Sequence, residues 1–132
     1  MGSRKRIVTL TALAMAVVIL ISNVLAEDLN ARYSYISVIS ASLQIRGSTA
    51  KATGRIVPSG NLATDISVKL QQQQSDGSWL TVASWSNSSS SGFCDAGGSA
   101  TIVTGYTYRT YVVGHVYDAD GNIIDTGTAY KY

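Results

Sequence analysis

Cysteine, histidine and proline are almost absent from this sequence. Its 132 residues include one of each: Cys94, His115 and Pro58. A single cysteine cannot form an intramolecular disulfide, so the fold has to be stabilised by a packed core, which about a hundred residues can supply. The residues on either side of Cys94, Phe93 and 95–98, are typical of a loop. This context favours a partly exposed thiol over a buried or intermolecularly paired one.

The first 26 residues have the pattern of a secretory signal peptide. Basic residues at 4–6 precede an apolar stretch at 7–21, and residues 24–26 suit a signal peptidase. The apolar stretch is shorter than the ~20 residues that a membrane-spanning helix needs, so cleavage is favoured over an uncleaved anchor. We therefore expect a signal helix at 1–26, cleaved after Ala26.

Positive charge is scarce once this segment is removed. Three of the ten Lys and Arg residues lie at 4–6, whereas all eight Asp and Glu residues follow Ala26. Seven basic and eight acidic residues remain, a net charge of −1, without a basic patch among aromatic residues. A nucleic-acid partner is not supported. We expect 27–132 to form one secreted, extracellular domain that meets a membrane only through its signal peptide before cleavage.

Helical periodicity is missing after Ala26, and short β-type stretches separated by turn residues take its place. The expected strands cover 32–46, 49–57, 64–74, 78–86, 99–103, 106–118 and 123–130. A serine- and glycine-rich loop is expected at 87–98. The first strand changes its apolar parity near Ser40, as a bulged strand does. About seven strands predict an all-β fold, a two-sheet antiparallel β-sandwich of the immunoglobulin-like kind.

The longest β-type stretch, 106–118, is expected to be a central strand with two alternating rows of side chains. The inner row is mostly apolar: Tyr106, Tyr108, Thr110, Val112, Gly114 and Val116. The outer row carries the only positive charge and the only histidine of this stretch, and consists of Thr107, Arg109, Tyr111, Val113, His115 and Tyr117. The inner tyrosines are expected to face the small residues of the second strand, which are Ala50, Ala52 and Gly54.

The strand at 78–86 has apolar residues of mixed parity. It follows the hairpin signal at 75–77, and its large apolar residues are Trp79, Leu80, Val82 and Trp85. One face of a strand cannot hold all four. We therefore expect an edge strand with one exposed tryptophan.

Four short motifs resemble a known family. They are Arg32-Tyr-Ser-Tyr35, Asp76-Gly-Ser-Trp79, Ser84-Trp-Ser86 and Gly105-Tyr-Thr-Tyr-Arg109. Together with the signal peptide, they resemble a family of small secreted proteins of Gram-positive bacteria, a domain of unknown function. The resemblance implies an exported β-sandwich and brings no catalytic residues. The architecture is similar to immunoglobulin and fibronectin-type sandwiches without the disulfide of antibody domains, and Gly105-Tyr106 is similar to their tyrosine corner.

Catalytic and metal-binding patterns are weak. His115 lies mid-strand without a Gly-x-Ser-x-Gly elbow or an evident partner, so catalysis is not expected. Asp118, Asp120 and Asn122 place oxygens at alternate positions, as a calcium loop does, but the closing carboxylate is missing. The same residues match a hairpin turn, which is favoured. We expect neither a metal site nor a cofactor.

The aromatic residues, eight Tyr and two Trp, are the remaining functional signal. Tyr111, His115 and Tyr117 share the outer row, where rings ~6–7 Å apart can line a strip that binds cell-wall carbohydrate or protein. Cross-strand packing without a ligand is the alternative explanation. We therefore expect a secreted, non-catalytic binding or surface-interaction module. One alternative is a structural protein of an extracellular matrix that adds strands edge to edge, and a second is a small secreted hydrolase.

Overall fold

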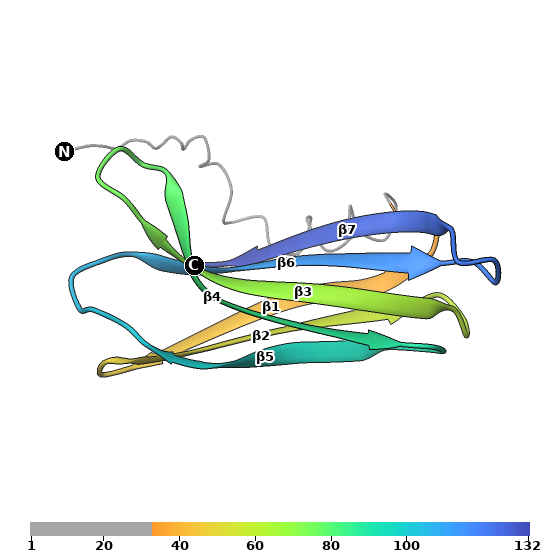
Figure 1. Ribbon diagram of the computed structural model, residues 1–132, viewed down its shortest axis with the longest axis horizontal. Helices are drawn as coiled ribbons and strands as arrows, with labels where there is room; N and C mark the ends of the chain where they lie inside the picture. The colour runs from red at the N-terminus through yellow and green to blue at the C-terminus, as the bar shows by residue number, and fades with distance from the viewer. Residues whose placement is uncertain (1–32) are drawn as a thin grey trace. The chain divides into compact units, whose positions relative to one another are not determined.

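The computed structural model describes residues 33–132, which form seven β-strands and no helix (Figure 1). They are β1 (Ile36–Arg46), β2 (Thr49–Pro58), β3 (Ala63–Gln73), β4 (Trp79–Ser89), β5 (Cys94–Thr101), β6 (Tyr108–Tyr117) and β7 (Ile123–Lys131). The predicted all-β fold is confirmed. The signal peptide predicted at 1–26 lies outside the described residues, as does the segment 27–32. Within the described part of the chain, nothing helical is long and apolar enough to span a bilayer.

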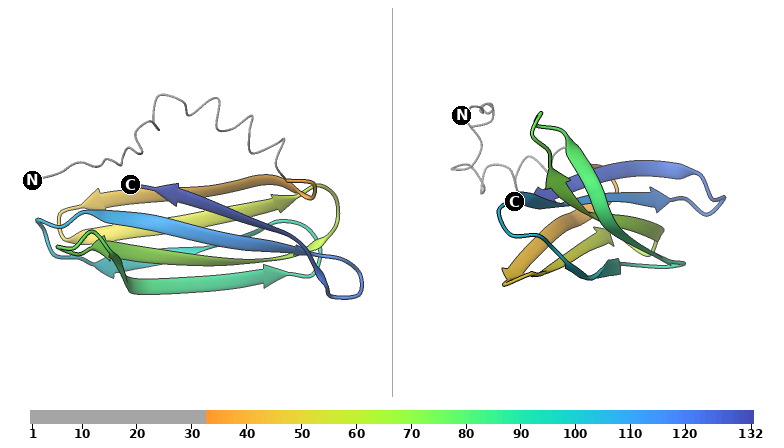
Figure 2. Two further views of the ribbon diagram at one scale, coloured as in Figure 1. Left: turned by 90° about the horizontal axis from the view of Figure 1, so that it is seen from above. Right: turned by 60° about the vertical axis from the view of Figure 1, so that its left-hand side comes forward.

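The strands form two antiparallel sheets that face each other as a sandwich (Figure 2). The smaller sheet has the order β1-β2-β5 and the larger one the order β4-β3-β6-β7. In a constant-type immunoglobulin domain the fourth strand belongs to the same sheet as the fifth. Here β4 pairs with β3 instead. The predicted two-sheet sandwich is therefore confirmed, with its fourth strand in the other sheet.

Alternation of side chains on β2, β3 and β6 builds the core between the sheets. The following side chains are fully buried: Ala50, Ala52, Ile56, Val68, Leu70, Thr110, Val112 and Val116. Burying one large aliphatic side chain stabilises a fold by about 1.5–3 kcal/mol. The inner row predicted for the long strand is confirmed from Tyr108 to Val116.

Tyr106 does not belong to that inner row. It is 53% exposed, because β6 begins two residues later, at Tyr108. The hydroxyl of Tyr108 is instead buried, accepts a hydrogen bond from Val103 N at 3.0 Å and donates one to Val103 O at 3.3 Å. A tyrosine hydroxyl bonded to backbone a few residues upstream is the geometry of a tyrosine corner. The corner predicted for Tyr106 is therefore made by Tyr108.

The bulge predicted in the first strand lies earlier than expected. The pairing of β1 with β2 shifts between Ile36 and Val38, not near Ser40. The shift lets both Ile36 and Ile39 point into the core, at 2% and 5% exposure. Two buried isoleucines three residues apart require such an irregularity, because regular strand alternation would place them on opposite faces.

At Gly54, the expectation that the small inner residues of β2 face tyrosines is wrong. Gly54 lies against the side chains of Val68 and Val112 instead. These valines come from the two central strands of the larger sheet. The absence of a side chain at Gly54 therefore serves close packing between the two sheets.

Strand β5 occupies a stretch predicted to be largely loop. Residues 94–101 pair with β2 along their whole length, and Cys94 is 4% exposed, so the expected partly exposed thiol was wrong. Thr64 Oγ1 donates a hydrogen bond to Cys94 Sγ at 3.4 Å, and burial raises the pKa of the thiol. Gly97 and Gly98, which suggested a loop, are paired strand residues. At Gly98 a glycine is needed, because a Cβ atom there would collide with the Trp85 indole.

Strand β4 lies at the edge of the larger sheet, as predicted, and a bulge explains its mixed parity. Leu70 pairs with Ala83 but Gln71 pairs with Thr81, which leaves Val82 as an extra residue. Bulges bend a strand and increase its twist. The tip of the β3–β4 hairpin accordingly turns away from the plane of the other strands (Figure 1).

The bulge places the two tryptophans of β4 on opposite sides of the sheet. Trp85 packs on Gly98 of the smaller sheet, whereas Trp79 lies beside Arg109 on the solvent-facing side. Both are half-buried, so the prediction of one exposed tryptophan was wrong. The exposed apolar residues of this strand are Leu80 and Val82.

Candidate functional site

The solvent-facing side of the four-stranded sheet, called the outer face below, carries the residues predicted to form the site. Directly opposite residues of antiparallel strands share a face. The register therefore forms three rows across β3, β6 and β7: Lys69–Tyr111–Tyr130, Ser67–Val113–Thr128 and Asp65–His115–Thr126. Tyr111, His115 and Tyr117 lie half-buried on this one face, as predicted for the outer row.

An arginine surrounded by aromatic rings lies at one end of the outer face. The guanidinium carbon of Arg109 is 4.2 Å from the ring centroid of Trp79 and 4.7 Å from that of Tyr130. The rings of Tyr111 and Tyr132 lie at 5.6 and 5.9 Å. A guanidinium within ~6 Å of a ring face is attracted to it by about 0.5–1 kcal/mol at an exposed site. We call these five residues the arginine–aromatic cluster.

Hydrogen bonds and stacking fix the orientation of this cluster. Arg109 Nε donates to Gln71 Oε1 at 2.8 Å, and Nη1 donates to Tyr132 Oη at 3.4 Å. The rings of Tyr111 and Tyr130 stack with centroids 4.8 Å apart, and partial burial raises the pKa of Tyr130. The phenol of Tyr130 is therefore uncharged at neutral pH. Because a guanidinium already occupies the space among the rings, a cationic ligand would meet like charge there.

A second polar group lies at the other end of the outer face. Asp65 Oδ1 and His115 Nδ1 are 2.6 Å apart, and the Tyr117 hydroxyl donates to Asp65 Oδ2. The hydrogen bond to Asp65 raises the pKa of Tyr117. Asp65 was not among the predicted site residues. Its outward position in β3 was visible in the sequence, but the register that sets it opposite His115 joins strands that are not consecutive.

A shallow hollow of about 380 Å³ adjoins this second group. It is lined by side chains of β3, β4 and β6, among them Asp65, Ser67, Ser86, Ser88 and His115. The lining offers hydroxyl groups that donate and accept hydrogen bonds, together with carboxylate and imidazole groups. Such a surface suits a polar, hydroxyl-rich ligand better than an apolar one.

The arrangement provides only part of a hydrolase site. Asp65 orients His115 through Nδ1 and leaves Nε2 directed to other partners, as in a catalytic dyad. Within residues 33–132, however, His115 forms no hydrogen bond with a serine, threonine or cysteine. Cys94 is not placed to act as a nucleophile for His115. Its thiol is bonded to Thr64 on the core side of β3, whereas Asp65, the partner of His115, points to the opposite side of that strand. The dyad as it stands can hold a ligand by hydrogen bonds.

The loop considered for calcium is a hairpin turn in this structure. Asp118 Oδ1 accepts hydrogen bonds from the backbone N–H groups of Asp120 and Asn122, both at 2.9 Å. These bonds, that with Asn122 foremost, hold the pKa of Asp118 below its ordinary value. No group of three or more His, Cys, Asp or Glu side chains suited to a metal ion occurs in residues 33–132.

The three predicted residues divide between the two ends of the outer face. Tyr111 belongs to the arginine–aromatic cluster, whereas His115 and Tyr117, with ring centroids 6.3 Å apart, belong to the group around Asp65. Sequence reasoning missed Tyr130, which stacks on Tyr111, and Tyr132, which stacks on Tyr130. The C-terminal Tyr-Lys-Tyr was a usable signal, because alternate residues of a strand share a face.

Comparisons with known proteins are weak. No family model and no curated protein matches the chain. A β-glucuronidase from Ruminococcus gnavus, solved with D-glucuronic acid, is similar at 15% identity over 72% of this chain, with a TM-score of 0.39. The chain spans only 15% of that enzyme. The N-terminal domain of PorA is similar at 9% identity over 70% of this chain and 81% of that domain, with a TM-score of 0.36. Likenesses at such scores say nothing about function.

Proposed function

We propose that the chain is a secreted, non-catalytic β-sandwich that binds a carbohydrate or protein ligand across its outer face. The observation that carries the proposal is the arginine–aromatic cluster, in which five side chains meet on one side of the larger sheet. Two of its rings, Tyr130 and Tyr132, are 46% and 67% exposed and can receive a partner. Aromatic residues and arginine dominate the binding energy of protein contacts, and sugar rings stack on aromatic faces.

The remainder of the outer face favours a carbohydrate. Short hydroxyl side chains complete the face, since Ser67 and Thr128 lie between its two ends and Thr126 lies opposite His115. A glycan chain combines apolar ring faces with many hydroxyl groups, and this face offers aromatic rings and hydrogen-bonding groups side by side. A protein partner needs a buried central anchor, which the outer face does not provide as clearly.

Retention of the purified chain on insoluble cell-wall polysaccharide and on intact bacterial cells tests the proposal. We expect the Tyr130→Ala/Tyr132→Ala variant to lose retention about tenfold or more, the usual cost of removing aromatic contacts at the centre of a binding surface. Tyr106→Ala is a matched control, because Tyr106 is a similarly exposed tyrosine outside the outer face. Equal retention of wild type and the double variant would remove the cluster from the site.

The Tyr111→Ala/Tyr117→Ala variant tests the residues predicted from sequence alone, one at each end of the face. Because Tyr111 belongs to the arginine–aromatic cluster, Tyr117→Ala alone is compared with the double variant, and loss of retention in Tyr117→Ala as well would indicate a ligand that spans both ends. If the wild-type chain binds intact cells but not polysaccharide, and the variants lose binding to cells, the partner is a protein.

Secretion is part of the proposal and is supported by the pattern of residues 1–26 and by the resemblance to small secreted Gram-positive proteins. Sequencing the N-terminus of the protein from culture medium tests it. We expect the mature chain to begin at Glu27. A membrane-retained chain that keeps Arg4–Arg6 would contradict secretion.

Assembly of copies into an extracellular matrix is the second candidate, supported by Leu80 and Val82, which are 52% and 42% exposed on the edge strand β4. The bulge at Val82 opposes it, because bulges interrupt regular edge-to-edge pairing. Concentration-dependent sedimentation that Leu80→Lys abolishes would favour assembly.

A hydrolase would instead require turnover of a generic ester, peptide or glycoside substrate that His115→Ala abolishes.

A further inference from the structure

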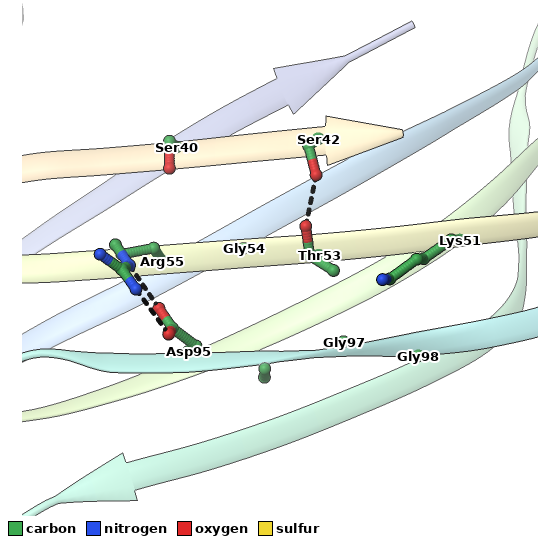
Figure 3. A pocket seen from close by; sticks show the side chains of 10 residues that line it. Ser40, Ser42, Lys51, Thr53, Gly54, Arg55, Asp95, Gly97 and Gly98 are labelled. Carbon is green, nitrogen blue, oxygen red and sulfur yellow. Dashed lines mark hydrogen bonds and ion pairs between the residues drawn. The ribbon is translucent and has the colours of Figure 1, made fainter. Parts of the chain in front are cut away.

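The smaller sheet has a hollow of its own, on the opposite side of the sandwich from the outer face. It has a volume of about 550 Å³ and lies over β1, β2 and β5 (Figure 3). Its polar lining consists of Ser40, Ser42, Lys51, Thr53, Arg55 and Asp95. No aromatic ring contributes to the lining, which distinguishes this hollow from the arginine–aromatic cluster.

The hollow exists because the middle row of the smaller sheet has short side chains. The register places Ser42, Thr53 and Gly97 in one row, and the longer Lys51 and Arg55 in the rows on either side. The hydroxyl groups of Ser42 and Thr53 hydrogen-bond to each other on its floor. Gly97 has a φ of 150°, and a Cβ atom there would collide with the backbone of β2, so the floor cannot be raised by a side chain at this position.

The two cationic side chains beside the hollow differ in their partners. Arg55 forms a two-point ion pair with Asp95, with Nε–Oδ1 at 2.7 Å and Nη2–Oδ2 at 2.9 Å, and its guanidinium lies 4.9 Å from the Phe93 ring centroid. Lys51 has no hydrogen bond or ion pair within residues 33–132. In Figure 3 its side chain leans from β2 toward the space between β2 and β5. The lining thus carries one uncompensated positive charge.

We propose that this hollow is a second binding site, and that its ligand is a saccharide bearing an anionic group. The anionic group of the ligand pairs with the Lys51 ammonium, and its hydroxyl groups bond to Ser42, Thr53 and the Arg55–Asp95 pair, which offers donors and an acceptor in fixed positions. Nucleic acid does not fit, because the lining has neither a stacking ring nor several free cations. A protein anchor does not fit a polar hollow without an apolar pocket.

Binding of sulfated dextran to the purified chain at low salt, compared with unmodified dextran and with inorganic sulfate, tests this site. We expect Lys51→Gln to weaken binding of sulfated dextran about threefold to tenfold, the effect of losing one charged contact near a surface. Asp95→Asn should strengthen it by a similar factor, because it removes a negative charge and releases Arg55. Lys131→Gln is the matched control, since Lys131 is an exposed lysine at the end of β7 that pairs with the inward-facing Thr110 and so does not belong to the outer face.

Equal losses from Lys51→Gln and Lys131→Gln would reduce the effect to general electrostatic attraction and overturn the proposal. Sulfate binding as strong as that of sulfated dextran would also overturn it, because a saccharide would then contribute nothing. NMR amide shifts of the wild-type chain supply a readout that needs no variant. We expect the probe to shift Gly97 and Gly98, which line the hollow, and to leave Gly127 of β7 unchanged. The part of the binding that depends on Lys51 should persist in the Tyr130→Ala/Tyr132→Ala variant, so failure here and failure of the outer face can be told apart.

Discussion

Gly54 of β2 lies against the side chain of Val112 of β6, so closely that a Cβ atom at Gly54 would stand 2.7 Å from Val112 Cγ2. The same Cβ atom would stand 2.9 Å from Val68 Cγ2. This contact joins the central strand of the smaller sheet to the two central strands of the larger one. It therefore sets the distance between the sheets at the middle of the core.

Gly54→Ala is expected to destabilise the fold by about 1–3 kcal/mol, because a methyl group inserted into a close-packed core forces its neighbours to move. Val112→Ala in the same chain should recover part of that loss by vacating the space. Urea unfolding of both single variants and the double variant measures the coupling. Strictly additive losses would show that the two residues do not compete for one volume.

Leu70→Ala should cost about 2–4 kcal/mol, since Leu70 is fully buried and its truncation leaves a cavity. Tyr111→Ala should cost much less, because Tyr111 is only half-buried on the outer face and its loss opens no cavity between the sheets. Thermal or urea unfolding compares them. A larger effect at Tyr111 would mean that the ring stacking with Tyr130 contributes more to stability than the core position.

Tyr117 should ionise at a higher pH than an ordinary tyrosine, because its hydroxyl donates a hydrogen bond to Asp65 and loses that bond when deprotonated. Its pKa is raised above the unfolded value of about 10. The stabilising contribution is therefore fully present below that value and is lost as the pH rises through the folded pKa. NMR of ring-labelled tyrosine should show the Tyr117 titration moving to lower pH in Asp65→Asn. An unchanged titration would contradict the role of Asp65.

Cys94 should react slowly with thiol reagents in the folded chain. Burial raises the pKa of its thiol, which leaves little thiolate at mildly alkaline pH, and only 4% of the residue is exposed. We expect a chromogenic disulfide reagent to label Cys94 at a rate that increases steeply with urea. The urea-unfolded chain gives the reference rate. Labelling of the native chain at that rate would contradict the buried position.

The strand pattern of this protein could be predicted from alternation, but the positions of the strand irregularities could not. The inner rows of β2, β3 and β6 follow directly from their sequences, because buried residues alternate with less buried ones along β2, along β3 as far as Leu70, and along β6. The bulges at Ile36–Val38 and at Val82 depend on contacts between strands, and no single stretch of sequence specifies them. Glycine made β5 resemble a loop. Its glycines are instead required by close contacts, because a Cβ atom at Gly98 would collide with the indole of Trp85 and one at Gly97 with the backbone of β2.

The candidate site was predictable on one strand only. Tyr111, His115 and Tyr117 belong to β6, where alternation alone puts them on one face. Asp65 on β3 and Tyr130 on β7 reach the same face through the strand order of the larger sheet, which alternation does not give. Prediction of the full group needed the pairing of β3 with β6, strands separated by two others in the chain.

The bulge at Val82 gives the protein two separate optical reporters on a single strand. The half-buried Trp85 packs against Gly98 of the smaller sheet, whereas Trp79 stacks with Arg109 at the solvent-facing side. The indole emission of Trp85 follows the integrity of the sandwich, and that of Trp79 follows the state of the outer face. Trp79→Phe and Trp85→Phe chains therefore allow loss of structure and ligand arrival to be recorded independently, without an added dye.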